Sequence, residues 1–160
     1  MTEKSANHTS ISFIMNKKHK RLITELKKIA THFKLTLSKI EIIRKTAFAL
    51  DLLNKKLVVM DEKDHPYFKT IDLGKVQACT LKVDYRNISA GELNEKSMED
   101  FIDNVQLNIA HVEPEKSVLI RFYDKKENSI HELRRLINIA TGWRDRITSV
   151  LPSRLQQVRA

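Results

Sequence analysis

Few residues in this sequence have the types and spacing that catalysis or metal binding requires. His111 and Glu113 share one face of an expected strand, where an imidazole and a carboxylate could bind a metal ion or exchange a proton. Because a metal site needs more converging ligands, a surface pair at a strand end is the favoured interpretation. His131 and Glu132 open an expected helix, but Arg135 stands where a zinc protease carries its second histidine.

Phosphate loops, reactive thiols and calcium loops are not predicted either. The glycines stand too far apart for the common phosphate-binding patterns: Gly74, Gly91 and Gly142. Cys79 alternates with expected core positions, so we expect a buried structural thiol and not a nucleophile. Three carboxylates between two expected strands lack the spacing and the glycine of a calcium loop: Asp61, Glu62 and Asp64. The sequence therefore predicts no catalytic residue, cofactor or metal ion.

The single tryptophan, Trp143, stands beside Arg144 and Arg146. Arginines stack on indoles and pair with phosphates, so this group could form a ligand platform. Trp143 also lies on the apolar stripe of an expected helix, where large aromatic residues supply packing area. We therefore expect Trp143 to fill the core.

Composition bounds the class of protein. The chain has 160 residues, a net charge of +9 and one cysteine, which fits a single domain in a reducing compartment, with the cytoplasm as the expected location. No apolar run approaches the roughly 18 residues that a membrane span needs. The positive charge is concentrated at the ends, since residues 1–45 carry 11 Lys and Arg against 3 Asp and Glu.

The elements expected to carry that charge are helical. Residues 1–15 are expected to form a flexible terminus, and residues 16–45 a basic amphipathic helical segment. Within it, an apolar stripe recurs at three or four residues from 16 to 33: Leu22, Leu26, Ile29 and Phe33. Residues 36–44 fit either a short helix or the first strand. The candidate interaction residues are cations on this segment and on the last helix: Lys17, Lys18, Lys20, Arg21, Lys27, Lys28, Lys34, Arg144 and Arg146.

From residue 46 the apolar period changes to two, which predicts about six strands in hairpins, each with one solvated face. Ser129 and Glu132 then form a capping box for a long amphipathic helix that Pro152 ends. The predicted fold is α+β: an antiparallel curved sheet or partly open barrel capped by a long C-terminal helix, preceded by the basic helix. The domain is expected to span residues 46–152, with a tail at 153–160.

This arrangement resembles the pleckstrin-homology superfold over about residues 46–151. The runs 47–57 and 101–107 are similar to those of uncharacterised bacterial proteins with such a cytosolic domain. The resemblance implies a binding or scaffold role. Lipid-binding members carry a Lys-rich first hairpin loop followed by an Arg, whereas this loop holds only Lys55 and Lys56, so phosphoinositide binding is not implied.

The expected function is that of a non-catalytic binding or scaffold module that engages a protein partner through a sheet edge or groove. One alternative is peripheral association of the basic N-terminal helix with an anionic membrane, at its inner face. The other is nonspecific nucleic-acid binding, which the absence of an aromatic platform and of a helix-turn-helix disfavours. The oligomeric state stays open.

Overall fold

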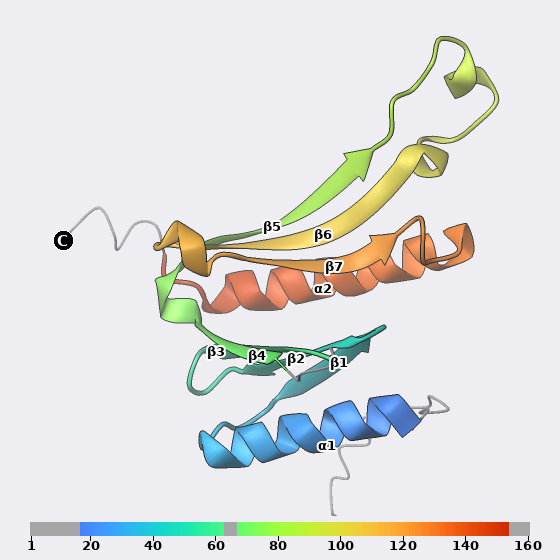
Figure 1. Ribbon diagram of the computed structural model, residues 1–160. Helices are drawn as coiled ribbons and strands as arrows, with labels where there is room; N and C mark the ends of the chain where they lie inside the picture. Colours follow the sequence, from blue (N-terminus) through green and yellow to red (C-terminus); the bar gives the residue numbers. More distant parts are fainter. Residues whose placement is uncertain (1–16, 63–66, 154–160) are drawn as a thin grey trace, which may run out of the picture.

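The computed structural model describes residues 17–62 and 67–153. It contains two helices and seven strands, together with short 3-10 turns (Figure 1): α1 (Lys17–His32), β1 (Lys39–Ile43), β2 (Thr46–Asp51), β3 (Lys56–Asp61), β4 (Tyr67–Asp72), β5 (Val76–Tyr85), β6 (Ile102–His111), β7 (Val118–Asp124) and α2 (Leu133–Val150). Two antiparallel sheets form, in the orders β1-β2-β3-β4 and β5-β6-β7. The α+β prediction is confirmed, with two sheets that do not join into a closed barrel in the described ranges.

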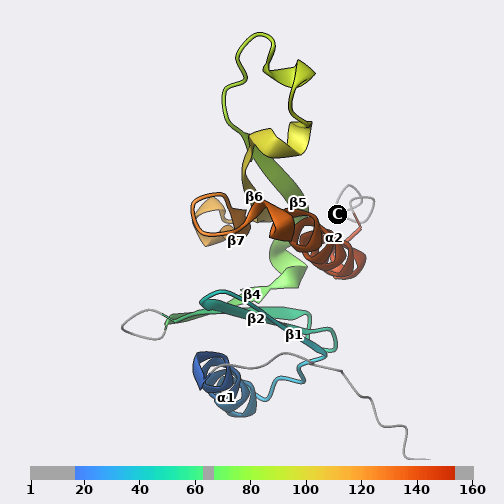
Figure 2. The ribbon, with the colours of Figure 1, turned by 90° about the vertical axis from the view of Figure 1, so that its right-hand side faces the viewer.

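The four-stranded sheet lies between two layers. Helix α1 covers one face, while α2 and the three-stranded sheet cover the other (Figures 1 and 2). Residues in β2 and β3 alternate between the two faces: Phe48, Leu50 and Leu57 join the main core, and Ala47, Ala49, Val58 and Met60 join a second cluster with α1. The prediction of one solvated face per strand is therefore wrong for β2 and β3.

Helix α1 matches the helix predicted from 16 to 33, and its apolar stripe packs on the sheet. Leu22 and Leu26 are buried there against the small side chains of β2, which let the helix approach closely. Phe33, just past the helix end, is 49% exposed. The helical part of the 16–45 segment is shorter than predicted, because residues 39–43 form β1. This strand, which the sequence left undecided, brings the number of strands to seven.

The three-stranded sheet forms from two long strands and a short one. Strands β5 and β6 project with their connecting segment beyond the rest of the fold (Figure 1). The predicted alternation in β5 is confirmed at Cys79, which is buried, and at Thr80 and Lys82, which are exposed. Tyr85, predicted on the buried face, is 49% exposed because it lies in the projecting part.

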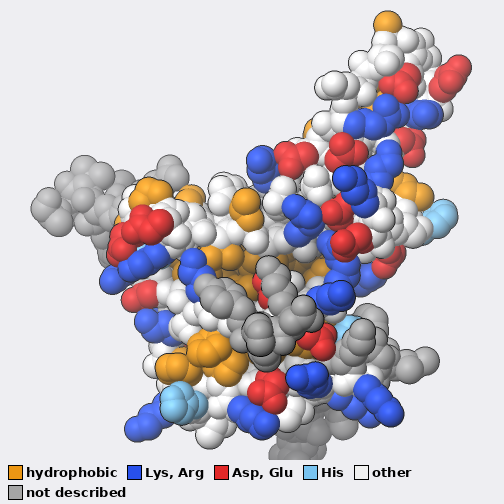
Figure 3. Space-filling model, viewed as in Figure 1, with side chains coloured by type: hydrophobic (Ala, Val, Ile, Leu, Met, Phe, Trp, Pro, Cys, Tyr) orange, Lys and Arg blue, Asp and Glu red, His pale blue; other side chains and the backbone are white. Residues whose placement is uncertain are grey.

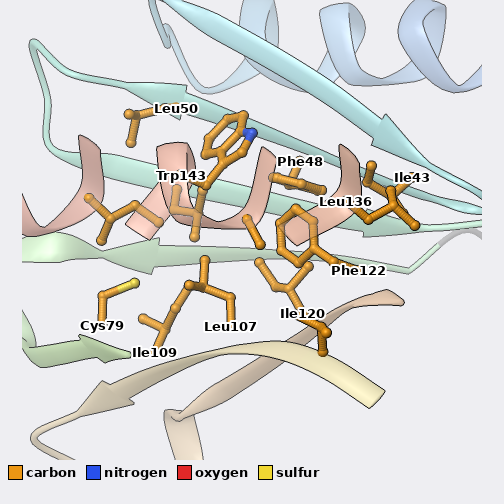
Figure 4. Packing of buried hydrophobic residues seen from close by; sticks show 14 of the residues in the cluster. Ile43, Phe48, Leu50, Cys79, Leu107, Ile109, Ile120, Phe122, Leu136 and Trp143 are labelled. Atoms are coloured by element: carbon orange, nitrogen blue, oxygen red, sulfur yellow. The ribbon is translucent and has the colours of Figure 1, made fainter. Parts of the chain in front are cut away.

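Helix α2 supplies the centre of the main core. The capping box is confirmed: Ser129 N–H donates to Glu132, and Ser129 Oγ accepts from the backbone of the 3-10 turn before the helix. Trp143 is fully buried and packs edge-on against Phe48, with ring centroids 4.6 Å apart (Figure 4). Its indole N–H donates to Glu41 at 3.4 Å. The prediction that Trp143 fills the core is confirmed.

Candidate binding groove

Within the described residues, a groove runs between β7 and the rim of the four-stranded sheet. Figure 2 shows α2 on one side of the space between the sheets and β7 on the other. On the β7 side the sheets leave a groove of about 1000 Å³. Figure 3 shows hydrophobic side chains in the depth of this hollow. Apolar residues of both sheets line it: Ile43, Val59, Val118 and Ile120.

Strand β7 borders this groove with an unpaired edge. His111, at the end of β6, donates its N–H to Ser117 Oγ just before β7, whereas the next residue, Val112, donates to the Lys75 carbonyl just before β5. The odd-numbered residues of β6 therefore direct their backbone groups towards β7. Leu119 and Arg121 lie opposite even-numbered residues of β6. Their N–H and C=O groups therefore point away from β6. Along the described chain, no other backbone group hydrogen-bonds to them.

Two bridges between the sheets flank β7. At its C-terminal end, Arg44 in the β1–β2 turn forms an ion pair with Glu127. At its N-terminal end, Lys69 Nζ of β4 donates to the carbonyl of Lys116 at 3.2 Å. The seven residues of β7 between these bridges span about 23 Å at about 3.3 Å per residue. The groove thus has the length of a short strand.

The groove rim carries charges of both signs in nearly equal number: Arg44, Lys45, Lys69 and Arg121 against Asp61, Glu62 and Glu127. Arg121 pairs with Asp124 at 3.0 Å, and the backbone N–H of Lys126 together with Arg121 lowers the pKa of that carboxyl. Asp61 accepts from Thr46 Oγ1 at 2.6 Å. A ligand in the groove therefore meets apolar side chains and free backbone groups more than net charge.

The cations predicted on α1 are exposed on the side of the helix away from the sheet: Lys17, Lys20, Arg21, Lys27 and Lys28. The side chain of Lys18 lies outside what the structure describes. The one acid of the helix, Glu25, pairs with Lys28 at 3.0 Å. Lys34 follows the helix and is exposed with a φ of 54°. The five exposed cations of α1 form one basic face: Lys17, Lys20, Arg21, Lys27 and Lys28.

Arg144 and Arg146 do not join that basic face. They belong to α2, on the opposite side of the four-stranded sheet from α1 (Figure 1). Arg144 pairs with Asp145 at 3.0 Å, and Arg146 lies near Lys39, whose pKa is lowered by burial and by that guanidinium. The two arginines are thus separate from the other candidate residues.

The residues considered for chemistry have structural partners. Glu113 does not face His111 as a second ligand: its carboxylate pairs with Lys116 at 2.7 Å, while its N–H donates to His111 Nδ1 at 3.0 Å. Burial raises the pKa of the Cys79 thiol to about 12, as expected for a structural thiol. Asp64 lies outside the described residues. In the ranges that are described, no three His, Cys, Asp or Glu side chains gather where they could share a metal ion.

The sequence predicts binding at a sheet edge or groove but does not indicate the residues that form it. The groove joins the β1–β2 turn, β3 and β7, which are far apart in the chain. One signal was present: Leu119 is an apolar residue on the expected solvated face of β7, and it is 58% exposed.

Within residues 17–62 and 67–153, no helix has the length and apolar character needed to cross a membrane. A scan against protein-family models, a search of curated proteins and a search of solved structures each found no match to this chain.

Proposed function

We propose that this chain is a non-catalytic binding module that accepts an extended segment of a partner protein as an added strand along β7. The observation that carries this proposal is the pair of unpaired backbone positions, Leu119 and Arg121, beside an apolar groove. Main-chain hydrogen bonds to such an edge supply affinity, and pockets for alternate side chains supply specificity.

The rim of the groove defines the chemistry of the partner. Because Arg44 and Arg121 already have acidic partners, the groove offers little net attraction to a strongly charged ligand. The apolar side chains of Ile43 and Ile120 favour burial of apolar groups. The partner segment is therefore extended and largely uncharged, with an apolar residue at every second position.

We include in this proposal that the fold is a variant of the pleckstrin-homology superfold. Four antiparallel strands, then three, then a long helix follow one another, and the helix closes one side of the space between the sheets. A cytoplasmic location is part of the same proposal, and the single buried Cys79 supports it.

Selection of short random peptides on the immobilised protein tests the strand-addition proposal. The selected peptides should carry alternating apolar residues and shift the backbone NMR signals of β7. Leu119→Pro removes an N–H that faces away from β6, which an edge strand tolerates, and it should abolish binding. Leu119→Ala, which keeps that N–H, should retain most of the affinity.

Equal binding by Leu119→Pro and the unchanged protein would overturn the proposal. So would peptides whose NMR footprint lies away from β7. If sedimentation instead shows a dimer that Leu119→Pro dissociates, the occupant is a second copy of the chain and the separate partner is rejected.

The basic face of α1 supports a second candidate function, attachment to an anionic membrane. The apolar stripe of α1 is buried against the sheet, so the attraction would come from charge alone, at about 1 kcal/mol per cation near the surface. Lys20→Glu with Lys27→Glu should then release the protein from phosphatidylglycerol vesicles, whereas Lys82→Glu on β5 should not. Absence of vesicle binding at low salt would reject this function.

A further inference from the structure

A small cationic pocket lies where β4 turns into β5, beside the end of β6. Its volume is about 270 Å³, which leaves room for a phosphate group and several waters, at about 30 Å³ per water. Residues from β4, from the 3-10 turn η1 (Leu73–Lys75), from β6 and from the 3-10 turn η4 (Pro114–Lys116) line it, among them Lys69, Thr70, Asp72, Lys75, His111 and Lys116.

His111 presents a hydrogen-bond donor to this pocket. Its Nδ1 accepts the N–H of Glu113 at 3.0 Å, so the ring hydrogen is on Nε2. The residue is only 6% exposed, and among the described residues Nε2 has no hydrogen-bond partner. Every fully buried side-chain nitrogen and oxygen in that part of the chain does have a partner. The Nε2–H group therefore reaches the pocket surface.

Three lysines surround the imidazole. Lys69 Nζ donates to the Lys116 carbonyl at 3.2 Å, and Lys116 pairs with Glu113. Lys75 is exposed and forms no ion pair with another described residue. One carboxylate, Asp72, also lines the pocket, but Lys56 lies 3.4 Å from it.

We propose that this pocket binds a phosphate dianion, either as inorganic phosphate or as a phosphate monoester group. The Nε2–H of a neutral imidazole and nearby ammonium groups are suitable donors for phosphate oxygens, and hydrogen bonds from charged donors are stronger than neutral ones. This site is distinct from the proposed strand-addition site on β7, although Lys69 borders both cavities.

Titration of the full chain with inorganic phosphate, at constant ionic strength in sodium chloride, tests the proposal. The NMR signals of the His111 ring and the Glu113 amide should shift and saturate. Lys75→Gln should weaken binding about tenfold or more, the effect of losing one charge-assisted hydrogen bond. His111→Asn keeps an acceptor for the Glu113 amide but removes the Nε2 donor, so it should weaken binding as well. Lys126→Gln, a lysine outside the pocket, should have no effect.

Two further ligands distinguish the sources of the phosphate group. Phosphoserine and vesicles that contain phosphatidic acid present the same dianion on a peptide-like and on a lipid carrier. Tighter saturable binding of either one, lost in Lys75→Gln, supports the site and identifies the source. Shifts that grow linearly with phosphate concentration, or that are equal in Lys75→Gln and Lys126→Gln, would overturn the proposal.

Discussion

The guanidinium of Arg44, in the turn between β1 and β2, forms an ion pair with Glu127, in the turn that follows β7. This pair ties the rim of the four-stranded sheet to the three-stranded sheet at one end of the groove. It is the only ion pair within the described residues that bridges those two turns. The pair therefore lies at the end of the groove where an added partner strand would enter or leave it.

Arg44→Gln is expected to change the free energy of unfolding little and to raise the rate at which a peptide enters the groove. The side chains of Arg44 and Glu127 are 25% and 61% exposed, and exposed pairs contribute about 0–1 kcal/mol. A double-mutant cycle with Glu127→Gln, measured by urea unfolding, should give a coupling energy below about 1 kcal/mol. Selected peptides should associate faster with either variant. A coupling energy well above that range would show that the bridge holds the two sheets together.

Replacement of Trp143 should destabilise the protein strongly. The side chain is fully buried against Phe48, so Trp143→Ala should cost about 3–5 kcal/mol. Since Trp143 is the only tryptophan, native fluorescence should be blue-shifted and resistant to iodide. Leu53→Ala, at a side chain that is 80% exposed, is the control and should change stability by less than about 0.5 kcal/mol. Strong iodide quenching of the native protein would contradict the observed core.

Asp51 should make stability depend on pH in the acid range. Burial acts to raise the pKa of this carboxyl, but hydrogen bonds from Asn54, Thr36 and Leu53 outweigh it and lower the pKa below 3.8. The carboxylate therefore stabilises the fold fully above the unfolded pKa, and this contribution is lost as the pH falls through the lower folded pKa.

Asp51→Asn should cost about 1–3 kcal/mol at neutral pH, because it removes the charged acceptor of the hydrogen bonds from Thr36 and Asn54. The stability gap between the two proteins should close as the pH falls below about 3.8. Glu115→Gln, an exposed acid, is the control and should leave the pH profile unchanged. A gap that stays constant down to the lowest pH would refute the role of the charge.

Gly142→Ala should stabilise the protein by up to about 1 kcal/mol, the difference in helix propensity. An added Cβ there would meet only Arg146, whose terminal nitrogen lies 3.3 Å away and can move. Gly91→Ala is the opposite case, because Gly91 has a φ of 88°, and the variant should be less stable although no atom lies within 4 Å of the new Cβ. Thermal unfolding tests both: the midpoint temperature should rise in Gly142→Ala and fall in Gly91→Ala.

The sequence predicted the regular elements better than their layering. Helix α2, its capping box and the buried Trp143 followed from a clear period and a single apolar stripe. The burial of the second face of the four-stranded sheet could not be predicted in this way, because Ala47 and Ala49 are small residues that occur on buried and on exposed faces of strands. The continuous apolar run at residues 57–60 was the better indicator, since it is typical of a strand buried on both faces.

Two features required three-dimensional information. Residues 36–44 fit both periods, and only pairing with β2 makes β1 a strand. The phosphate pocket depends on His111 together with Lys75, which are brought together by the pairing of β5 with β6. Spacing along the chain favours a surface pair of His111 and Glu113, and it gives no indication that the backbone N–H of Glu113 donates to the imidazole.

Amide hydrogen exchange along β7, followed residue by residue in the free protein, tests the central claim most directly. The N–H groups of Val118 and Ile120 face β6 and should exchange slowly, whereas those of Leu119 and Arg121 should exchange rapidly. Addition of a selected peptide should slow the exchange of Leu119 and Arg121 only. Uniform protection along β7 in the free protein would contradict an open edge, and rapid exchange of Leu119 and Arg121 in the presence of the peptide would contradict strand addition.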